Sequence, residues 1–221
     1  MLDFLLDFLF PPKCPICGGY VERRHSWCPA CLANQLQVRR LPLAADMGSV
    51  FDGGVWALGS YEGGLRDVLR QLKYDGRKDL LPGLHQFIAA GLAELPVDLG
   101  GSGETMLLVP VPLHRDKLRE RGFNQSELLF QNPFQALQIA MGRALQRERA
   151  TVPQFGLTAG QRQENLRSAF ALRSDRGVTG RHIILADDIM TTGATLQACG
   201  ELLRRAGAKH ITGLAVASGR K

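Results

Sequence analysis

Apolar residues fall into two patterns along the chain. Residues 106–111, 182–186 and 211–217 are almost continuous apolar runs, and this predicts strands that are buried on both faces of a sheet. Residues 55–61 are predicted to form a further strand. Strands of this kind need helices on both sides to cover them.

Helical spacing of apolar residues appears between these strands. In residues 65–74 the apolar face consists of Leu65, Val68, Leu69 and Leu72. Residues 84–95 and 195–208 are also predicted helices, and Gly207 is a natural residue to end the second. Residues 126–146 are broadly helical with an interruption at Asn132-Pro133. Alternating strands and helices predict an α/β fold with a mostly parallel sheet and helices on both faces.

Two Cys-x-x-Cys pairs, ten residues apart, stand near the start of the chain. They are Cys14, Cys17, Cys28 and Cys31. Four thiolates at this spacing can close a tetrahedron around zinc, and the compact spacing favours zinc over an iron–sulfur cluster. A redox Cys-x-x-Cys normally occurs once, at a helix start. We therefore predict a zinc-binding module over residues 1–45, where zinc holds a segment too short to bury a core, and a second domain over residues 46–221.

The sharpest motif is HIILADDIMTTGATL, where a buried strand leads through two acids into a small-residue loop and a helix. Main-chain N–H groups and hydroxyls of Thr191, Thr192, Gly193, Ala194 and Thr195 can bind a phosphate at the positive end of that helix. Asp187 and Asp188 would face vicinal ribose hydroxyls or a magnesium ion. The motif predicts a ribose-phosphate site. The alternative is an ordinary turn in which Asp188 caps the helix.

Composition restricts the class of protein further. Lysine and arginine total 27 against 21 acids, and the net charge of +6 suits an anionic ligand or nucleic acid without choosing between them. Four of the five cysteines cluster near the start, which favours a reducing compartment. Residues 1–13 lack the basic start and cleavage site of a signal peptide, and no apolar run reaches the roughly 20 residues of a membrane span. We expect a cytoplasmic protein.

A family resemblance rests on this motif and on three further stretches. Residues 184–195 resemble the phosphoribosyl-pyrophosphate motif of type I phosphoribosyltransferases. The chain as a whole resembles the ComF-type family (ComFC- and GntX-like proteins), which is linked in bacteria to competence and DNA uptake. The other matching stretches are YEGGLRDVLRQLKYDGR, VPVPLHRDKLRERGFNQSELL and PQFGLTAGQRQENLRSAFAL. Residues 131–135 (QNPFQ) have no counterpart that we can match in the family pattern.

The resemblance implies a type I phosphoribosyltransferase fold that binds 5-phosphoribosyl-1-pyrophosphate with magnesium. Asp187 and Asp188 would hold the ribose hydroxyls and residues 191–195 the 5-phosphate. The loop after the strand at residues 106–111 would contact pyrophosphate through Pro112, Leu113 and His114. Asn124 and Gln125 would either contact a polar acceptor or fix this loop.

The resemblance also places a catalytic loop over residues 151–170, where Arg162 and Arg167 would stabilise the departing pyrophosphate. The expected activity is transfer of a phosphoribosyl group to an acceptor that the sequence does not name. The alternative is a non-catalytic component of DNA uptake that binds single-stranded DNA or proteins of the uptake machinery. Aromatic residues make up only 7% of the chain, few for base-stacking platforms.

Overall fold

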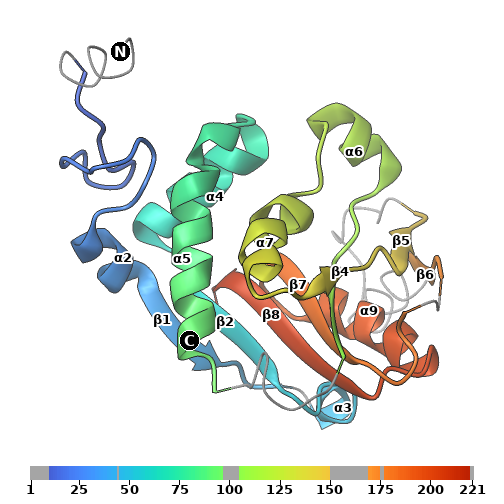
Figure 1. Ribbon diagram of the computed structural model, residues 1–221. Helices are drawn as coiled ribbons and strands as arrows, with labels where there is room; N and C mark the ends of the chain where they lie inside the picture. The colour runs from blue at the N-terminus through green and yellow to red at the C-terminus, as the bar shows by residue number, and fades with distance from the viewer. Residues whose placement is uncertain (1–9, 44, 97–104, 150–168, 175–176, 220–221) are drawn as a thin grey trace.

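A six-stranded sheet forms the centre of the protein, with helices on both faces (Figure 1). The structure is a computed structural model and describes residues 10–43, 45–96, 105–149, 169–174 and 177–219. The sheet order is β1-β2-β8-β7-β3-β4, and only β1 is antiparallel to its neighbour. Its strands are β1 (Leu36–Arg40), β2 (Val55–Ser60), β3 (Met106–Pro110), β4 (Ala140–Met141), β7 (His182–Met190) and β8 (His210–Ser218).

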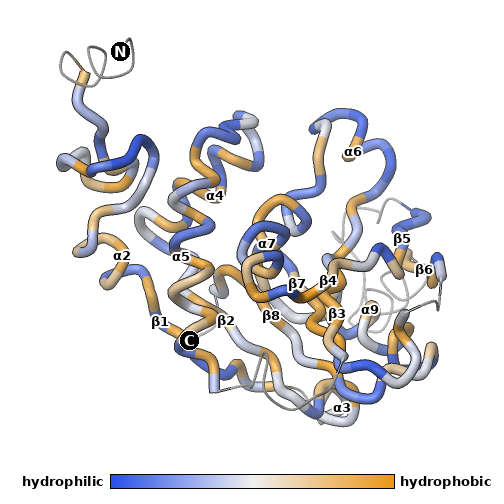
Figure 2. The backbone as a smooth tube through the Cα atoms, in the orientation of Figure 1, coloured by the Kyte–Doolittle hydropathy of each residue, from blue (hydrophilic) through white to orange (hydrophobic). Residues whose placement is uncertain are grey.

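Two hydrophobic cores lie on opposite faces of this sheet, because successive strand side chains point to opposite sides. Leu108 and Ile184 belong to the first core, whereas Leu107 and Ile183 belong to the second. The first core lies under α4 (Gly63–Tyr74), α5 (Leu81–Glu94) and α7 (Gln125–Ala136). The second lies under α9 (Ala194–Arg205). Figure 2 shows the apolar strands between these more polar helices. The predicted fold class is confirmed.

The remaining elements are short. They are α2 (Pro29–Gln35), α3 (Ala45–Gly48), the 3-10 helix η1 (Lys78–Leu80), α6 (Arg115–Arg121) and the antiparallel pair β5 (Leu145–Arg147) and β6 (Phe170–Leu172). No residue of α6 is buried, and Figure 1 shows this helix projecting beyond α7. Within the described residues, no helix combines the length and hydropathy needed to cross a membrane.

The chain after Pro133 differs from the sequence-based prediction. We expected helical structure over residues 126–146, but α7 ends at Ala136 and residues 140–141 and 145–147 are strands. Gln138 adopts a positive φ of 59°, which the α-helix does not allow and which turns the chain toward β4. The helical prediction was therefore wrong beyond residue 136.

The cysteine-bearing segment packs tightly on α5. Trp27 is 2% exposed, and its ring centroid lies 5.1 Å from that of Phe87. Gly83 allows this approach, since a Cβ there would lie 2.3 Å from Trp27 Cδ1 and 2.6 Å from the carbonyl oxygen of His25. The segment then continues into β1, the antiparallel edge strand that pairs with β2. Residues 36–40, which fall within the predicted zinc module, thus belong to the main sheet.

We predict that Gly83→Ala lowers the free energy of unfolding by about 1–3 kcal/mol. The added methyl group collides with Trp27 and a backbone carbonyl, and this overpacking outweighs the better helix propensity of alanine. Gly48→Ala is the control, because a Cβ at Gly48 meets no heavy atom within 4 Å. Urea titration of both variants measures the effect. An unchanged Gly83→Ala protein would contradict the packing described.

Candidate functional site

Both acids of the motif belong to strand β7. We expected the strand to end at Ala186, but it continues to Met190, because β8 runs beside it and pairs Asp187 with Ala215 and Ile189 with Ala217. The two carboxylates therefore stand at the carboxyl edge of a parallel sheet, where open α/β sheets bind their ligands.

Asp187 lies inward and accepts two hydrogen bonds. The hydroxyl of Ser126 donates to its Oδ1 at 3.1 Å, and the backbone N–H of Asp188 donates to the same oxygen at 2.9 Å. Burial, together with the nearby charge of Asp188, raises the pKa of Asp187 well above its usual value. This carboxyl group therefore retains its proton to a higher pH than an exposed aspartate does.

Asp188 has different partners. Its Oδ1 accepts from the backbone N–H of Ile189 at 2.9 Å, and its Oδ2 lies 3.6 Å from Lys73 Nζ. Asp188 thus contacts its own strand and α4, whereas the N-cap of α9 is Gly193. These contacts disfavour the alternative in which Asp188 caps a helix.

The loop after β7 turns at Gly193, which has a φ of 86°. A residue with a Cβ would be strained there and would also place that atom 2.7 Å from Met190 Cε. The Thr192 hydroxyl accepts from the backbone N–H of Ala194 at 3.4 Å. A helix of this length that begins at glycine presents the positive end of its dipole to the loop.

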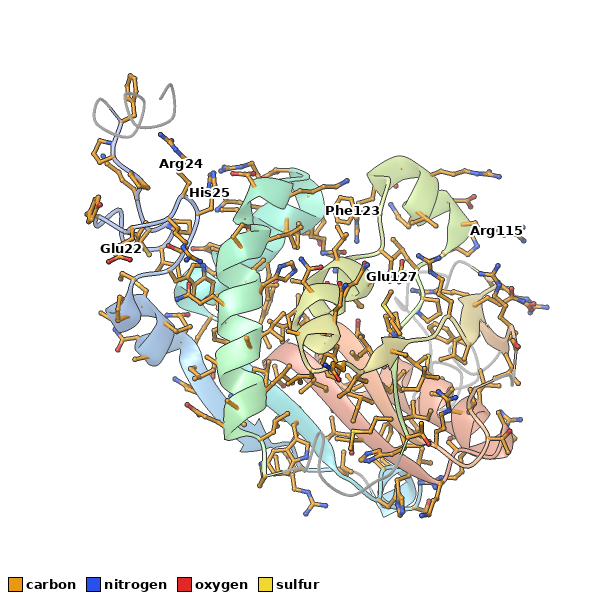
Figure 3. The ribbon with its side chains drawn as sticks, viewed as in Figure 1. Glu22, Arg24, His25, Arg115, Phe123 and Glu127 are labelled. Atoms are coloured by element: carbon orange, nitrogen blue, oxygen red, sulfur yellow. The ribbon has the colours of Figure 1, made fainter. Side chains whose placement is uncertain are left out.

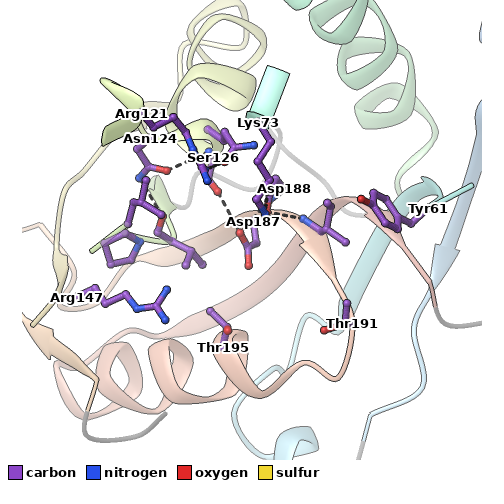
Figure 4. Close-up of a pocket in the computed structure, with 15 residues that line it drawn as sticks. Tyr61, Lys73, Arg121, Asn124, Ser126, Arg147, Asp187, Asp188, Thr191 and Thr195 are labelled. Atoms are coloured by element: carbon purple, nitrogen blue, oxygen red, sulfur yellow. Dashed lines mark hydrogen bonds and ion pairs between the residues drawn. The ribbon is translucent and has the colours of Figure 1, made fainter. Parts of the chain in front are cut away.

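A pocket of about 380 Å³ joins the acids to this loop (Figure 4). The predicted site residues that line it are Asp187, Asp188, Thr191, Thr195, Pro112 and Leu113. These six residues come from the ends of β3 and β7 and from the start of α9. Two segments that are about 75 residues apart in the sequence thus contribute to one cavity, as the parallel pairing of β3 with β7 requires.

Other predicted residues lie elsewhere. Thr192, Gly193 and Ala194 form the turn and the helix start without lining the pocket. His114 is the N-cap of α6, where its Nδ1 accepts from the backbone N–H of Asp116 at 3.3 Å. Arg162 and Arg167 lie outside the described residues.

Sequence reasoning missed several residues of this pocket. They are Tyr61, Lys73, Ser126 and Arg147. Figure 4 shows Lys73 reaching toward Asp188 from α4 and Arg147 on the other side of the acids. Ser126 had a local signal, since it continues the distinctive stretch RGFNQS. Lys73 had none, because its approach depends on how α4 packs on the sheet.

Asn124 and Gln125 also line the pocket, and Asn124 fixes the loop. Its Nδ2 donates to the carbonyl oxygen of Val111 at 3.0 Å, and its Oδ1 accepts from the backbone N–H of Ser126 at 3.2 Å. Gln125 Oε1 accepts from Arg121, while its buried Nε2 has no hydrogen-bond partner among the described residues. Of the two alternatives for this pair, the contacts of Asn124 support a structural role.

A larger cleft of about 1040 Å³ adjoins the pocket and shares Pro112, Leu113, Asn124 and Arg147 with it. Its charged lining consists of Arg115, Glu127, Arg143, Arg147, Glu148, Arg149 and Arg173. Positive charge therefore predominates, and guanidinium groups suit phosphate oxygens. Figure 3 shows Glu127 and Phe123 near the start of α7, and Arg115 on the projecting α6.

The four N-terminal cysteines converge on one point. Their sulfur atoms all lie within 4.8 Å of one another. Backbone N–H groups point at these sulfurs, from Gly19 to Cys17 at 3.4 Å and from Cys31 to Cys28 at 3.4 Å. Burial alone would raise the pKa of Cys14, but hydrogen bonds from backbone N–H groups lower it to about 7. The arrangement fits a tetrahedral metal ion held by thiolates.

Two protein-family models match parts of the chain. Residues 5–56 match the double zinc ribbon domain, and residues 138–221 match the phosphoribosyl transferase domain. Residues 5–56 contain only the four clustered cysteines and His25 as typical zinc ligands, enough for one such ion. The cluster and the match together indicate a structural zinc site.

Curated relatives cover most of the chain. DNA utilization protein YhgH of Escherichia coli (strain K12) is 32% identical over 90% of this chain and 80% of its own length. Competence protein ComFC of Streptococcus pneumoniae is 31% identical over 90% of this chain and 84% of its own length. Among solved structures, a hypoxanthine phosphoribosyltransferase from Staphylococcus aureus is 14% identical with a TM-score of 0.39, and the match covers 62% of each chain.

We predict that Cys31→Ser abolishes stoichiometric zinc binding and lowers the melting temperature. Loss of one thiolate opens the tetrahedron, and the segment around Trp27 is too small to fold on its own core. Zinc content by mass spectrometry and thermal melting measure the two effects. The control is Cys199→Ala, whose buried thiol on α9 lies outside the cluster and should leave zinc content unchanged. Equal zinc content in both variants would contradict the assignment.

We predict that Asp187→Asn raises stability at neutral pH. A group whose pKa is raised on folding contributes stability below its unfolded pKa, near 3.9 for aspartate, and this contribution is lost as pH rises through the folded pKa. The neutral amide avoids that loss. The melting temperature of the variant should therefore exceed that of the wild type near pH 7, and the difference should shrink toward pH 4. A difference that is constant with pH would show that burial of charge is not its cause.

Proposed function

The chain belongs to the ComF family, and on this basis we propose that it binds 5-phosphoribosyl-1-pyrophosphate with magnesium and transfers the phosphoribosyl group to an acceptor. The observation that carries the proposal is the single pocket that joins Asp187 and Asp188 to the start of α9. It offers carboxylates for sugar hydroxyls and a helix N-terminus for a phosphate within one cavity.

The pyrophosphate part of the ligand would extend toward the arginine-lined cleft. Pro112, Leu113 and Arg147 line both cavities, so a ligand bound at the acids can reach the cleft without leaving the protein. Guanidinium groups there would stabilise the negative charge that develops on the leaving group. Arg162 and Arg167 stay in the proposal as further cations for this step.

Magnesium would enter this site with the pyrophosphate. The ion prefers one or two protein carboxylates together with substrate phosphates over a cage made by protein alone. Asp187 and Asp188 supply at most two carboxylates at the pocket, which fits that preference. Bound magnesium would neutralise charge on the phosphate oxygens.

The proposed reaction is a substitution at the anomeric carbon. A bond forms from the nucleophilic atom of the acceptor to that carbon, while the bond from the carbon to the pyrophosphate oxygen breaks. Pyrophosphate departs with the bonding electron pair, and the acceptor releases its proton. The names of the relatives, DNA utilization protein and competence protein, support a role in the handling of DNA or its components.

We predict that Asp187→Ala combined with Asp188→Ala weakens binding of the donor by more than about 100-fold. Each carboxylate removed costs a charge-assisted hydrogen bond to a ribose hydroxyl. Calorimetry with 5-phosphoribosyl-1-pyrophosphate and magnesium measures the change. Asp67→Ala is the control, since Asp67 is an exposed aspartate of α4 that lies outside the pocket.

Catalysis is tested separately, by pyrophosphate release in the presence of a panel of bases and amines. Tight donor binding without release under any condition would contradict the transfer step while leaving the binding step intact. Single-strand DNA binding that weakens steeply with salt and persists in the double variant would favour the non-catalytic alternative.

A further inference from the structure

Lys73 brings a positive charge to the acid pair from a distant part of the chain. Its Nζ lies 3.6 Å from Asp188 Oδ2, and its side chain is 29% exposed against 13% for that of Asp188. Lys73 stands in the last turn of α4 and lines the same pocket as Thr191 and Thr195. Figure 4 shows its side chain descending to Asp188. The phosphoribosyl transferase match, over residues 138–221, does not include it.

The position of Lys73 is fixed by the packing of its helix. The apolar face of α4, which includes Leu69 and Leu72, is fully buried in the first core, where α4 contacts β2 and η1. At the other end of the helix, Gln35 Oε1 accepts from the backbone N–H of Leu65 at 3.0 Å. The helix therefore holds the Cα of Lys73 in place, and only the side chain has to order when it meets Asp188.

The other cations that line the pocket have different contacts. Arg121 donates to Gln125 Oε1, and the guanidinium of Arg147 lies 5.2 Å from the ring centroid of Phe170. Among the described residues that line the pocket, Lys73 alone forms an ion pair with either aspartate. Arg147 also interacts electrostatically with Asp187, so the ammonium group of Lys73 is the partner of Asp188 in particular.

We propose that Lys73 is part of the ribose-phosphate site, and that its ammonium group neutralises Asp188 so that a ribose 5-phosphate group binds without a divalent cation. This inference rests on the proposed function, in which magnesium enters with the pyrophosphate of the donor, so that a ligand without pyrophosphate does not require the ion. The phosphate of the ligand is an anion that an uncompensated Asp188 would repel across a small pocket. Lys73 removes that repulsion before any ligand arrives.

Lys73 also orients the acceptor groups of Asp188. One carboxylate oxygen faces the ammonium group, and the other accepts from the Ile189 N–H. Each carboxylate oxygen has two lone-pair directions, so one on each oxygen stays available to a sugar hydroxyl. Lys73 is therefore a positioning residue that acts on the ligand through Asp188.

The test is calorimetry of the full chain with ribose 5-phosphate in magnesium-free buffer, without a chelator that would strip zinc. We expect the wild type to bind and Lys73→Met to bind about tenfold more weakly, because the variant leaves the Asp188 charge unpaired. Lys73→Arg should restore most of the affinity. Arg70→Met removes one positive charge from an exposed position on the same helix and should have no effect.

A double-mutant cycle separates neutralisation from general damage. In an Asp188→Asn background, the charge that Lys73 neutralises is absent, so Lys73→Met should change affinity little. A tenfold loss that persists in this background would overturn the proposed role. If circular dichroism shows that Lys73→Met does not fold, two measurements still test the proposal. They are the affinity of the Lys73→Arg variant and the binding of ribose 5-phosphate by the wild type without magnesium.

Two other results would overturn the inference. Binding of ribose 5-phosphate by the wild type only after magnesium is added would show that a metal ion, not Lys73, neutralises the acids. Tighter binding by Lys73→Met would show that the ammonium group competes with the sugar. If the wild type binds neither ribose 5-phosphate nor the full donor with magnesium, the proposed function itself fails. If the donor binds equally well to the wild type and to Lys73→Met, only the role of Lys73 fails.

Discussion

Strand β7 pairs with β3 on one side and β8 on the other, and this double parallel pairing determines where the charged groups stand. β3 pairs with β7 as far as Ala186, and β8 pairs with it to Met190, so the backbone of β7 remains regular through the two acidic residues. The cavity, the helix start and the lysine contact all take their positions from this strand.

The two carboxylates of the pair have separate environments. Asp187 accepts hydrogen bonds from Ser126 and the backbone, which favour its ionised form, but burial and the charge of Asp188 outweigh them and raise its pKa. Asp188 instead faces an ammonium group. A pair with one buried, hydrogen-bonded acid and one ion-paired acid can offer both a donor and an acceptor to neighbouring hydroxyls. Identical residues thus provide different chemistry because their surroundings differ.

Features that are local in sequence were predictable, and those set by packing were not. The acids, the threonine loop and the cysteine pairs lie within short motifs whose spacing carries the chemistry. Lys73 and Tyr61 join the pocket only because α4 and β2 lie beside β7 and β8 in space. The end of α7 was missed because the positive φ of Gln138 leaves no periodic signal. His114 proved to be a helix cap, a role that Asn, Asp and Ser fill more often.

Helix α4 contacts the metal-binding segment at its first turn and the ligand pocket at its last turn. Gln35, just beyond the cysteine cluster, accepts a hydrogen bond from the first turn of α4. Ile16, from the first cysteine pair, packs against Gly64, where a Cβ would lie 2.5 Å from Ile16 Cγ2. A helix of 12 residues is about 18 Å long, so a tilt of three degrees at one end displaces the other by about 1 Å. Loss of zinc would therefore shift the last turn of α4 and weaken the contact between Lys73 and Asp188.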